Sequence, residues 1–450
     1  LSIRRQRQMC IRDRYIASFT TRWDGASHLA SGHKWESFPA GALAWRVSQE
    51  PFMESTKKWL NNLKLRLSYG ITGNSGGMGA YSSQTGAATY SPVSIDGELS
   101  SVSQLVSPYG NPSIGWEKTY QWNYGVDLGF FDGRINLSFD YYDSKTKDLL
   151  FSRTLPVTSA ITAWGSPMAT WQNIGETSNK GYEIQLSTVN VKSRNFQWSS
   201  SISYTHNDEK IVDLPDGDLI AKKLFEGHPI KTFYDFKYAG IWSTAEEEEA
   251  AKYGCQPGYV KIETVEQFTT DENGNLVGDG GVHTYSNTRD LQILGSNVPD
   301  GILGVNNTFK YRDFDLSVFA IVRYGQMIDS KTIGWYSANG NNQPRGTNYW
   351  TPENQSAYFP RPGIVSTTGI GSLKYIDGSY AKIKNITLGY TFPKKLCKTL
   401  GLEQCRLYAT AYNVFVLPFK SELKHSDPEN NGSDTFPLYK TYLLGLNVSF

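Results

Sequence analysis

Gly73, Ser75 and Gly77 have the G-x-S-x-G spacing that presents a nucleophilic serine in many hydrolases. That chemistry requires a helix directly after the serine, because the sharp strand-to-helix turn is what exposes the hydroxyl. Residues 78–83 show no helical period in their apolar positions. The sequence therefore predicts a loop here, and it predicts no catalytic residue.

Asp271, Asn273 and Asn275 match the first three ligand positions of a calcium-binding loop. Leu276 stands where the loop needs glycine, and Val282 stands where it needs a bidentate glutamate. The six histidines lie at positions 28, 33, 206, 228, 283 and 425 and show no i, i+4 spacing. We predict no metal site and no cofactor.

Two cysteines, Cys397 and Cys405, flank one predicted tight turn. They could form a disulfide in an oxidising compartment, which would leave Cys255 unpaired, or they could remain two free thiols.

One long loop, residues 326–374, combines aromatic rings with amide and guanidinium groups. Aromatic faces stack on the apolar faces of sugar rings, while amides and arginine bind hydroxyl groups. The candidate ligand-binding residues are Trp335, Tyr336, Asn341, Arg345, Tyr349, Trp350 and Tyr358. The alternative is that these rings pack the loop upon itself or upon a partner protein.

The segments that flank such loops alternate apolar and polar residues with a period of two. From Trp116 to Phe130 the even positions are mostly aromatic or aliphatic and the odd positions polar, and residues 134–147 repeat the pattern. About twelve such strands are expected, at 15–24, 34–48, 62–73, 116–130, 134–147, 181–191, 196–208, 300–311, 313–325, 375–392, 404–416 and 439–450. Segment 231–242 is expected to be a local hairpin inside a long excursion, and Ser243 and Glu246 should form a capping box before a short helix.

The connections between these strands alternate between short turns and long excursions. This is typical of outer-membrane β-barrels, with tight turns in the periplasm and long loops outside the cell. A soluble β-sandwich gives the same alternation. The final strand favours the barrel, because Tyr442, Leu444, Leu446, Val448 and Phe450 resemble the C-terminal signal read by the barrel assembly machinery.

The composition agrees with many strands and excludes a charge-driven partner. Of 450 residues 39% are hydrophobic and 14% aromatic, and 44 basic against 43 acidic residues give a net charge of +1. No excess of positive charge points to nucleic acid. Residues 1–14 hold five arginines and resemble a translated sequencing adapter, so we expect a non-native head followed by residues 15–450 as the barrel part.

Several ordered motifs resemble those of SusC/RagA-type TonB-dependent outer-membrane receptors. They are residues 34–40, 63–74, 111–112, 116–118, 179–183, 349–354, 384–390, 413 and 427–429. The resemblance covers nearly everything after residue 15 and corresponds to the C-terminal part of such receptors, without the plug domain, the TonB box and the signal peptide.

The resemblance implies active import of oligosaccharides or peptides across the bacterial outer membrane, by a multi-pass protein with no enzymatic activity. It implies a SusD-like surface lipoprotein, the TonB complex, the barrel assembly machinery and outer-membrane lipid as partners. Because about twelve strands are fewer than the roughly 22 of the family, the fold expected is a partial antiparallel transmembrane β-barrel, all-β in class. The alternatives are a passive porin, a siderophore-type receptor, or a soluble carbohydrate-binding sandwich.

Overall fold

A computed structural model describes most of the chain and divides it into two compact units. The described residues are 2–11, 14–90, 93–95, 98–100, 103–106, 109–156, 158, 162–163, 166–270, 276–336, 346–364, 368–399 and 401–450. The first unit comprises residues 1–187 and 207–230, and the second comprises residues 188–206 and 231–450. No described helix is long and apolar enough to cross a lipid bilayer.

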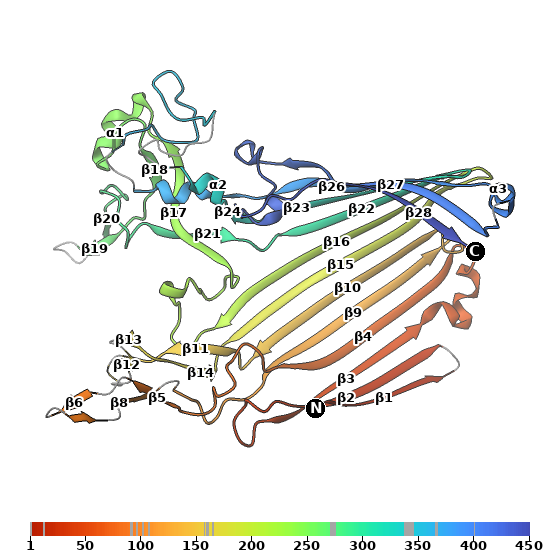
Figure 1. Ribbon diagram of the computed structural model, residues 1–450, viewed down its shortest axis with the longest axis horizontal. Helices are drawn as coiled ribbons and strands as arrows, with labels where there is room; N and C mark the ends of the chain where they lie inside the picture. Colours follow the sequence, from red (N-terminus) through yellow and green to blue (C-terminus); the bar gives the residue numbers. More distant parts are fainter. Residues whose placement is uncertain are drawn as a thin grey trace. The chain divides into compact units, whose positions relative to one another are not determined.

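The first unit is built on long antiparallel strands that pair in chain order (Figure 1). They are β1 (Ser2–Ile11), β2 (Tyr15–Gly25), β3 (Trp35–Arg46), β4 (Leu60–Asn74), β9 (Glu117–Phe130), β10 (Ile135–Lys147) and the first part of β15 (Glu176–Lys192), whose residues from 188 onward belong to the second unit. Antiparallel strands that are neighbours in the chain can be joined by a tight turn. The turn between β9 and β10 is an example, with Phe131 and Asp132 both at positive φ.

The second unit is also built on long antiparallel strands that pair in chain order. Its long strands are β16 (Phe196–Asp213), β22 (Gly301–Tyr311), β23 (Phe314–Tyr324), β26 (Tyr380–Thr391), β27 (Gln404–Pro418) and β28 (Thr441–Ser449). The pairing is antiparallel throughout, and it has register shifts within β26. All twelve strands predicted from the sequence are present, although the first residues predicted for β26 form a separate short strand.

The remaining elements are short and lie in the connections. The paired short strands are β5 (Ala87–Tyr90) with β8 (Ser103–Val106), β6 (Val93–Ile95) with β7 (Glu98–Ser100), β11 (Leu150–Thr154) with β14 (Ala169–Asn173), β12 (Thr162–Ala163) with β13 (Ser166–Pro167), β19 (Phe268–Thr270) with β20 (Leu276–Gly278), and β24 (Met327–Asp329) with β25 (Tyr375–Asp377). The α-helices are α1 (Glu247–Lys252), α2 (Lys331–Gly334) and α3 (Lys394–Thr399).

Residues 231–242 stay outside the long-strand meander, as predicted, but the predicted local hairpin is wrong, because the whole segment is a single strand. It forms β17 (Thr232–Ile241), which pairs with β18 (Val260–Glu263) and β21 (Leu291–Ser296) in a separate three-stranded sheet. This strand therefore does not join the long-strand meander.

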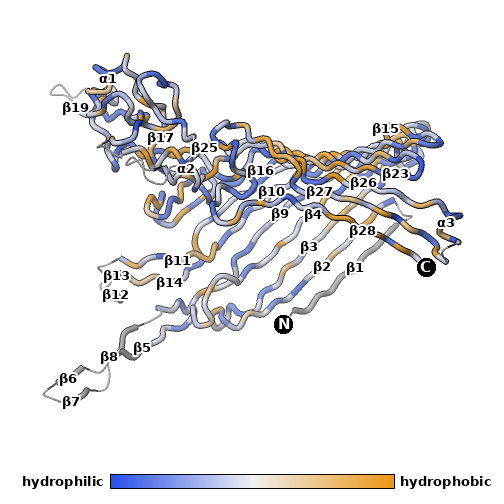
Figure 2. Tube along the Cα trace, turned by 45° about the horizontal axis from the view of Figure 1, so that its top comes forward, coloured by the Kyte–Doolittle hydropathy of each residue, from blue (hydrophilic) through white to orange (hydrophobic). Residues whose placement is uncertain are grey.

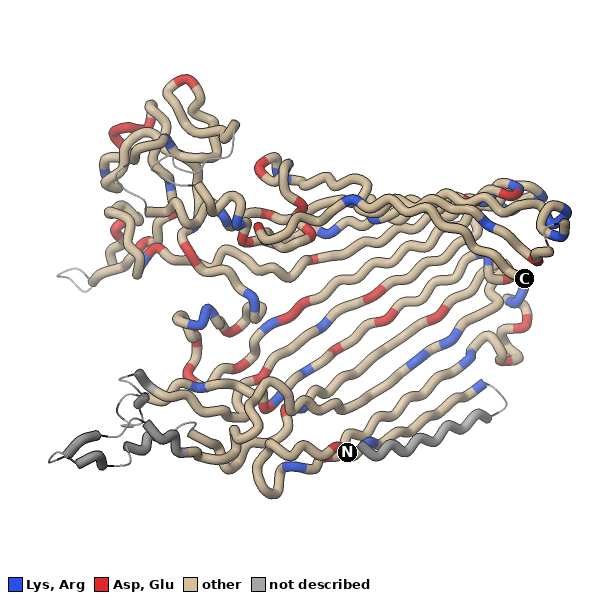
Figure 3. Tube along the Cα trace, in the orientation of Figure 1, with Lys and Arg blue, Asp and Glu red and all other residues tan. Residues whose placement is uncertain are grey.

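The long strands have one apolar and one polar face, and the tube in Figure 2 alternates accordingly along them. On β4 the apolar face carries Leu65 and Leu67, which pair with Val126 and Tyr124 of β9. The polar face carries Arg66, which with Asp127 and Asp140 forms an ion-paired cluster, and Figure 3 marks such charges along these strands. The predicted alternation is confirmed.

The backbone of the arginine-rich head forms β1. It pairs with β2 without a register shift, from Ser2 opposite Asp24 to Ile11 opposite Tyr15. Because a backbone ladder can form with many side chains, this pairing does not distinguish a native head from a non-native one. The prediction for residues 1–14 stays a prediction.

Candidate functional site

The long connections of the second unit fold into a small body of their own. We call it the loop body, formed by the described residues within 232–296, 327–377 and 421–434. Its core is apolar and buried, and consists of Phe236, Val260, Ile262, Ile328, Ile333, Leu373, Ile376 and Leu423. Since this core takes residues from three connections, each excursion is held in place by the other two.

Three of the predicted ligand-binding aromatics belong to the interior of the loop body. Tyr336 and Trp350 are 7% and 4% exposed, and the hydroxyls of Tyr336 and Tyr358 donate to backbone carbonyls of Pro360 and Leu373 at 2.5 Å. Burial raises the pKa of Tyr336 to about 12 and raises that of Tyr358 as well. These rings thus pack the loop upon itself, which is the alternative to ligand binding that the sequence left open.

Two predicted aromatics remain on the surface. Trp335 is 51% exposed and Tyr349 is 43% exposed. The indole nitrogen of Trp335 donates to Asp434 at 2.9 Å, which fixes the ring while its faces stay accessible. Asn341 and Arg345 lie outside the described residues. The ligand-binding role of all these residues stays a prediction.

The β27–β28 loop (residues 419–440) fixes Trp335 through a buried charge cluster on β26. The Lys382 side chain is fully buried, with its ammonium nitrogen 2.5 Å from Asp427 and 2.6 Å from Glu429. Lys384 also binds Glu429. Burying charges is costly unless they are paired, so this arrangement requires the loop to stay against the strand.

The same loop continues to the helix that precedes Trp335. The backbone N–H of Lys331, at the start of α2, donates to the carbonyl of Gly432 at 2.8 Å. Gly432 has φ +80°, and a β-carbon there would collide with the backbone at Asp329, so this close approach requires glycine. The charge cluster, Gly432 and Asp434 therefore connect the sheet to Trp335.

The charge cluster predicts a pH dependence for the β27–β28 loop. Burial alone would raise the pKa of Glu429, but the hydrogen bonds from Lys382 and Lys384 outweigh it and lower that pKa. A carboxylate with a depressed pKa stabilises the fold above its unfolded pKa of about 4.3 and loses that contribution as the pH falls through the folded value. Hydrogen exchange of residues 419–440, expressed at each pH relative to the intrinsic exchange rate of an unprotected amide, should therefore be steady from about pH 8 to 5 and accelerate below about pH 4.

The control for this pH experiment is Glu429→Gln, which cannot ionise. Its exchange should already be faster at neutral pH, and its further acceleration on acidification should be smaller than in the parent protein. An equal acid response in both proteins would contradict the assignment.

The predicted capping box is present at the start of the α1 segment. The Ser243 backbone N–H donates to Glu246 at 3.1 Å, and the Lys261 ammonium binds the same carboxylate at 2.7 Å. The hydrogen bonds from Lys261 and Ser243 lower the pKa of Glu246 to about 2. This acidic segment is therefore a structural part of the loop body.

The polar face of the first unit holds a pre-organised cluster of charges. The Arg66 guanidinium binds Asp127 in a bidentate manner, with both distances 2.9 Å, and Asp140 with both distances 2.8 Å. The hydroxyl of Ser138 donates to Asp127 at 2.9 Å. Such a network keeps one patch of the polar face rigid and charged.

No hydrolase-like site forms around Ser75. β4 ends at Asn74 and no helix occurs in residues 75–86. The His28 ring contacts the backbone carbonyl of Ser75 at 2.6 Å. Since no helix follows the strand, the predicted loop is confirmed.

The other titratable candidates form no centre in the described part of the chain. No group of three or more His, Cys, Asp or Glu side chains there could hold a metal ion. Asp271, Asn273 and Asn275 lie outside the described residues. Cys255, Cys397 and Cys405 are all free thiols. Cys397 and Cys405 therefore do not form the disulfide that the sequence left open.

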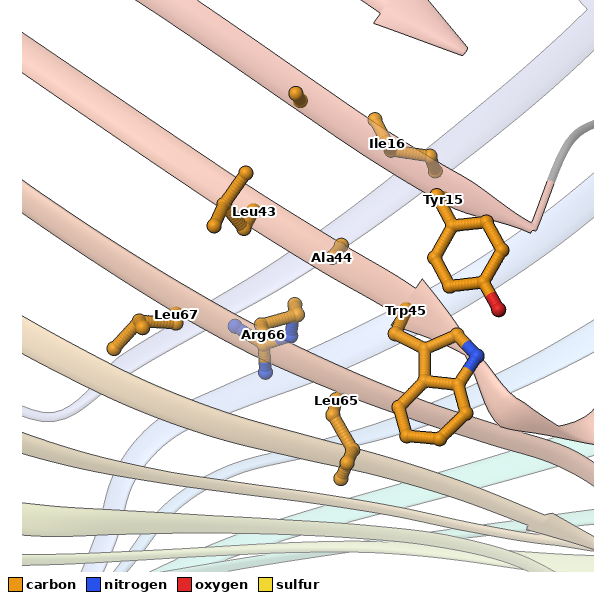
Figure 4. Close-up of a pocket in the computed structure, with 9 residues that line it drawn as sticks. Tyr15, Ile16, Leu43, Ala44, Trp45, Leu65, Arg66 and Leu67 are labelled. Carbon is orange, nitrogen blue, oxygen red and sulfur yellow. The ribbon is translucent and has the colours of Figure 1, made fainter. Parts of the chain in front are cut away.

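Four of the aromatic pairs on the apolar face of the described strands lie beside the short connections. Tyr15 stacks with Trp45 at 6.2 Å, and Figure 4 shows both rings at one end of a groove of about 410 Å³ that Leu43, Leu65 and Leu67 also line. The other pairs are Trp59 with Phe130, Trp198 with Phe309, and Phe314 with Tyr390. Amphipathic rings beside an aliphatic zone are typical of the boundary between membrane and water.

The last strand presents its predicted apolar positions outward. Tyr442, Leu444 and Phe450 are among the most exposed apolar residues, at 76%, 75% and 87%, and Leu446 and Val448 are also exposed. β28 pairs only with β27 in the described sheet. Their role as a signal for barrel assembly stays a prediction.

Long antiparallel strands paired in chain order, with one apolar and one charged face, are typical of the strands of large β-barrels. The chain matches the TonB dependent receptor-like β-barrel family over residues 6–414, and it belongs to that family. This is a family of outer-membrane transport receptors, and the predicted fold class and SusC/RagA resemblance are confirmed.

The individual relatives agree. TonB-dependent receptor P3 of Formosa agariphila is 30% identical over 466 residues, which cover 97% of this chain and 44% of the relative. TonB-dependent receptor SusC of Bacteroides thetaiotaomicron is 30% identical over 461 residues, covering 97% and 42%. The chain thus spans less than half the length of these relatives.

The fold is also that of a solved transporter. The RagAB peptide transporter structure superposes with a TM-score of 0.79 at 22% identity, covering all of this chain and 47% of that chain. Its open-open state gives a TM-score of 0.80 at 21% identity, covering all of this chain and 46% of that chain.

Sequence reasoning missed the role of Lys382, Asp427, Glu429 and Asp434. The family motifs at residues 384–390 and 427–429 were visible, but nothing in either motif indicated that the two meet. The available signal was Lys382, which lies close to an apolar run in β26. A buried lysine requires an acidic partner.

Proposed function

We propose that this chain forms part of the barrel of a receptor that imports a large nutrient, an oligosaccharide or a peptide, across the bacterial outer membrane. The observation that supports it best is the combination of a family-typical barrel with a folded, rigid loop body that keeps Trp335 and Tyr349 accessible. Fixed aromatic rings bind sugar rings or apolar peptide side chains at low entropic cost. Neither role needs a catalytic residue.

The energy source for transport and the partner proteins are part of the same proposal, which family membership supports. The receptor works with the TonB complex, pairs with a SusD-like surface lipoprotein, and is inserted by the barrel assembly machinery. Its strands cross the outer membrane several times, with their apolar faces in contact with lipid. The similar structure is that of the RagAB peptide transporter, which supports a peptide as well as a glycan as the solute proposed for this chain.

The test is uptake of labelled oligosaccharides and peptides by cells that carry or lack the receptor, each with and without functional TonB. Uptake that disappears when either the receptor or TonB is removed supports the proposal. Uptake that needs the receptor but not TonB would make it a passive porin, and a receptor-dependent iron siderophore uptake would make it a siderophore receptor.

Trp335→Ala is expected to weaken binding of the transported solute without unfolding the receptor. Loss of one exposed stacking ring costs about 1–2 kcal/mol, or about 5- to 30-fold in affinity. The measurement is the binding constant of the solute identified by the uptake experiment, determined on purified receptor by calorimetry.

The matched control for Trp335→Ala is Phe268→Ala. Phe268 is also an exposed ring of the loop body, at 61%, but it lies on the β19–β20 hairpin. It should leave solute affinity unchanged. Equal losses in the two variants would show that the effect is not specific to Trp335.

A further inference from the structure

The apolar face of β15, β16 and β22 contains a connected group of polar side chains. Asn190 donates to the Ser200 hydroxyl at 2.7 Å, and Ser200 donates to the Asn307 side-chain oxygen at 2.6 Å. The Trp198 indole donates to the same oxygen at 3.0 Å. All of these residues lie in the second unit.

These residues occupy the lipid side of the barrel strands. Trp198 pairs with Phe309 and Ser200 with Asn307 across β16 and β22, and the Trp198 and Phe309 rings stack at 5.7 Å. Following the register across the sheet, Asn307 is opposite Val318, Val318 is opposite Ile386, and Ile386 is opposite Ala411. From β23 to β27 the row is therefore apolar, and Asn307 lies at the edge of its polar part.

The amide of Asn307 has a fixed orientation with unused donors. An indole N–H can only donate, so the atom that it contacts must be the amide oxygen. That oxygen already accepts two hydrogen bonds, from Trp198 and Ser200. No partner for the amide nitrogen is found in the described residues, so its N–H groups can donate to a ligand with acceptor oxygens, which hydrocarbon chains do not offer.

The two tight turns beside this group carry an excess of positive charge. Lys192 and Arg194 lie at the β15–β16 turn and Arg312 at the β22–β23 turn, with Asp313 as the acidic residue. The turns touch, since the Arg312 backbone N–H donates to the Asn195 carbonyl at 2.8 Å. No ion pair involving these three basic residues is found among the described residues, and all three are exposed.

We propose that this surface binds an anionic glycerophospholipid of the periplasmic leaflet. Its phosphate contacts Lys192, Arg194 and Arg312, and its ester oxygens accept hydrogen bonds from Asn307. The basic residues, the aromatic pair and the amide follow one another from the turn toward the membrane interior, in the order of a lipid's phosphate, interface and ester groups. The inference rests on the proposed placement of the strands in the outer membrane.

The test is native mass spectrometry of the intact receptor, purified from outer membranes, titrated with phosphatidylglycerol or with phosphatidylethanolamine. Phosphatidylglycerol should bind in a one-to-one adduct and more tightly than phosphatidylethanolamine. The double substitution Lys192→Gln/Arg194→Gln should weaken that adduct by about fivefold for each charge removed. Asn307→Leu should also weaken it, since leucine fills similar space without donors.

The matched control is Lys394→Gln/Lys395→Gln, which removes two exposed basic residues from the α3 turn. It should leave the adduct unchanged. Equal binding of the two lipids, or an equal loss of the adduct in the control, would overturn the site. So would charge substitutions that abolish a receptor dimer and leave the lipid adduct unchanged. A receptor that does not fractionate with the outer membrane would instead refute the proposed placement. Because the two charge substitutions lie in exposed turns, they keep the test valid even if Asn307→Leu fails to fold.

Discussion

Lys382→Met is expected to detach the β27–β28 loop from the sheet and to destabilise the receptor by about 3–5 kcal/mol, the usual cost of removing one member of a buried ion pair. The substitution leaves Asp427 and Glu429 close together without the fully buried ammonium that both of them bind. Because the same loop holds α2 and Trp335 through Gly432 and Asp434, the effect should extend to the loop body.

Hydrogen exchange of the intact receptor measures this effect directly. Residues 419–440 and 331–336 should exchange faster in the variant, while β22 and β23 should not change. The further substitutions Asp427→Asn and Glu429→Gln, added to Lys382→Met, should restore part of the protection because they remove the uncompensated charges. The matched control is Lys395→Met, an exposed lysine of α3. Unchanged exchange in the Lys382 variant would show that the cluster does not hold the loop.

Trp350→Ala is expected to have the second large effect, a loss of about 3–5 kcal/mol from the loop body. The indole is 4% exposed and packs directly on Gly258, where a β-carbon would lie 2.8 Å from the ring. Gly258 belongs to another excursion of the chain than Trp350, so the ring packs two excursions together, and the Trp350 backbone N–H donates to the Phe359 carbonyl at 2.8 Å within its own excursion. Removing it leaves a cavity that the crossing segments cannot close.

Limited proteolysis of the loop body, read by mass spectrometry, measures the effect of Trp350→Ala. Cleavage within residues 346–364 should become faster, in proportion to the population of the opened state. Trp335→Ala is the matched control, because it removes the same ring type from an exposed position, and it should change the free energy of opening by less than about 0.5 kcal/mol. Similar cleavage of both variants would contradict the division between buried and exposed rings.

The strands could be predicted from the sequence because a half-buried strand repeats every two residues, and the pattern survives over twelve segments. The same rule fails locally in β26. There a β-bulge around Lys384 changes the parity, so that Lys382 turns to the polar face while Ile386 lies on the apolar face. An alternation read without the bulge places Lys384 beside Ile386 and Leu388.

The candidate site could be predicted only as a region. Trp335 and Tyr336 are adjacent in sequence, yet one ring is exposed and the other is buried, because the loop has no period that would assign a side chain to one face. Which rings form the core depends on contacts with β17 and with the β27–β28 loop, more than 80 residues away in either direction. Such contacts leave no local signal in the chain.

The central claim is that the long strands cross the outer membrane with the loop body outside the cell and the tight turns in the periplasm. The most direct measurement is labelling of single introduced cysteines in intact cells with a membrane-impermeant maleimide, in a background with Cys405→Ser. Glu248→Cys, on the exposed side of α1, should label in intact cells. Asp132→Cys and Lys395→Cys, in exposed turn positions, should label only after the outer membrane is permeabilised. Labelling of all three positions in intact cells, or of the turn positions in preference to Glu248, would contradict the account.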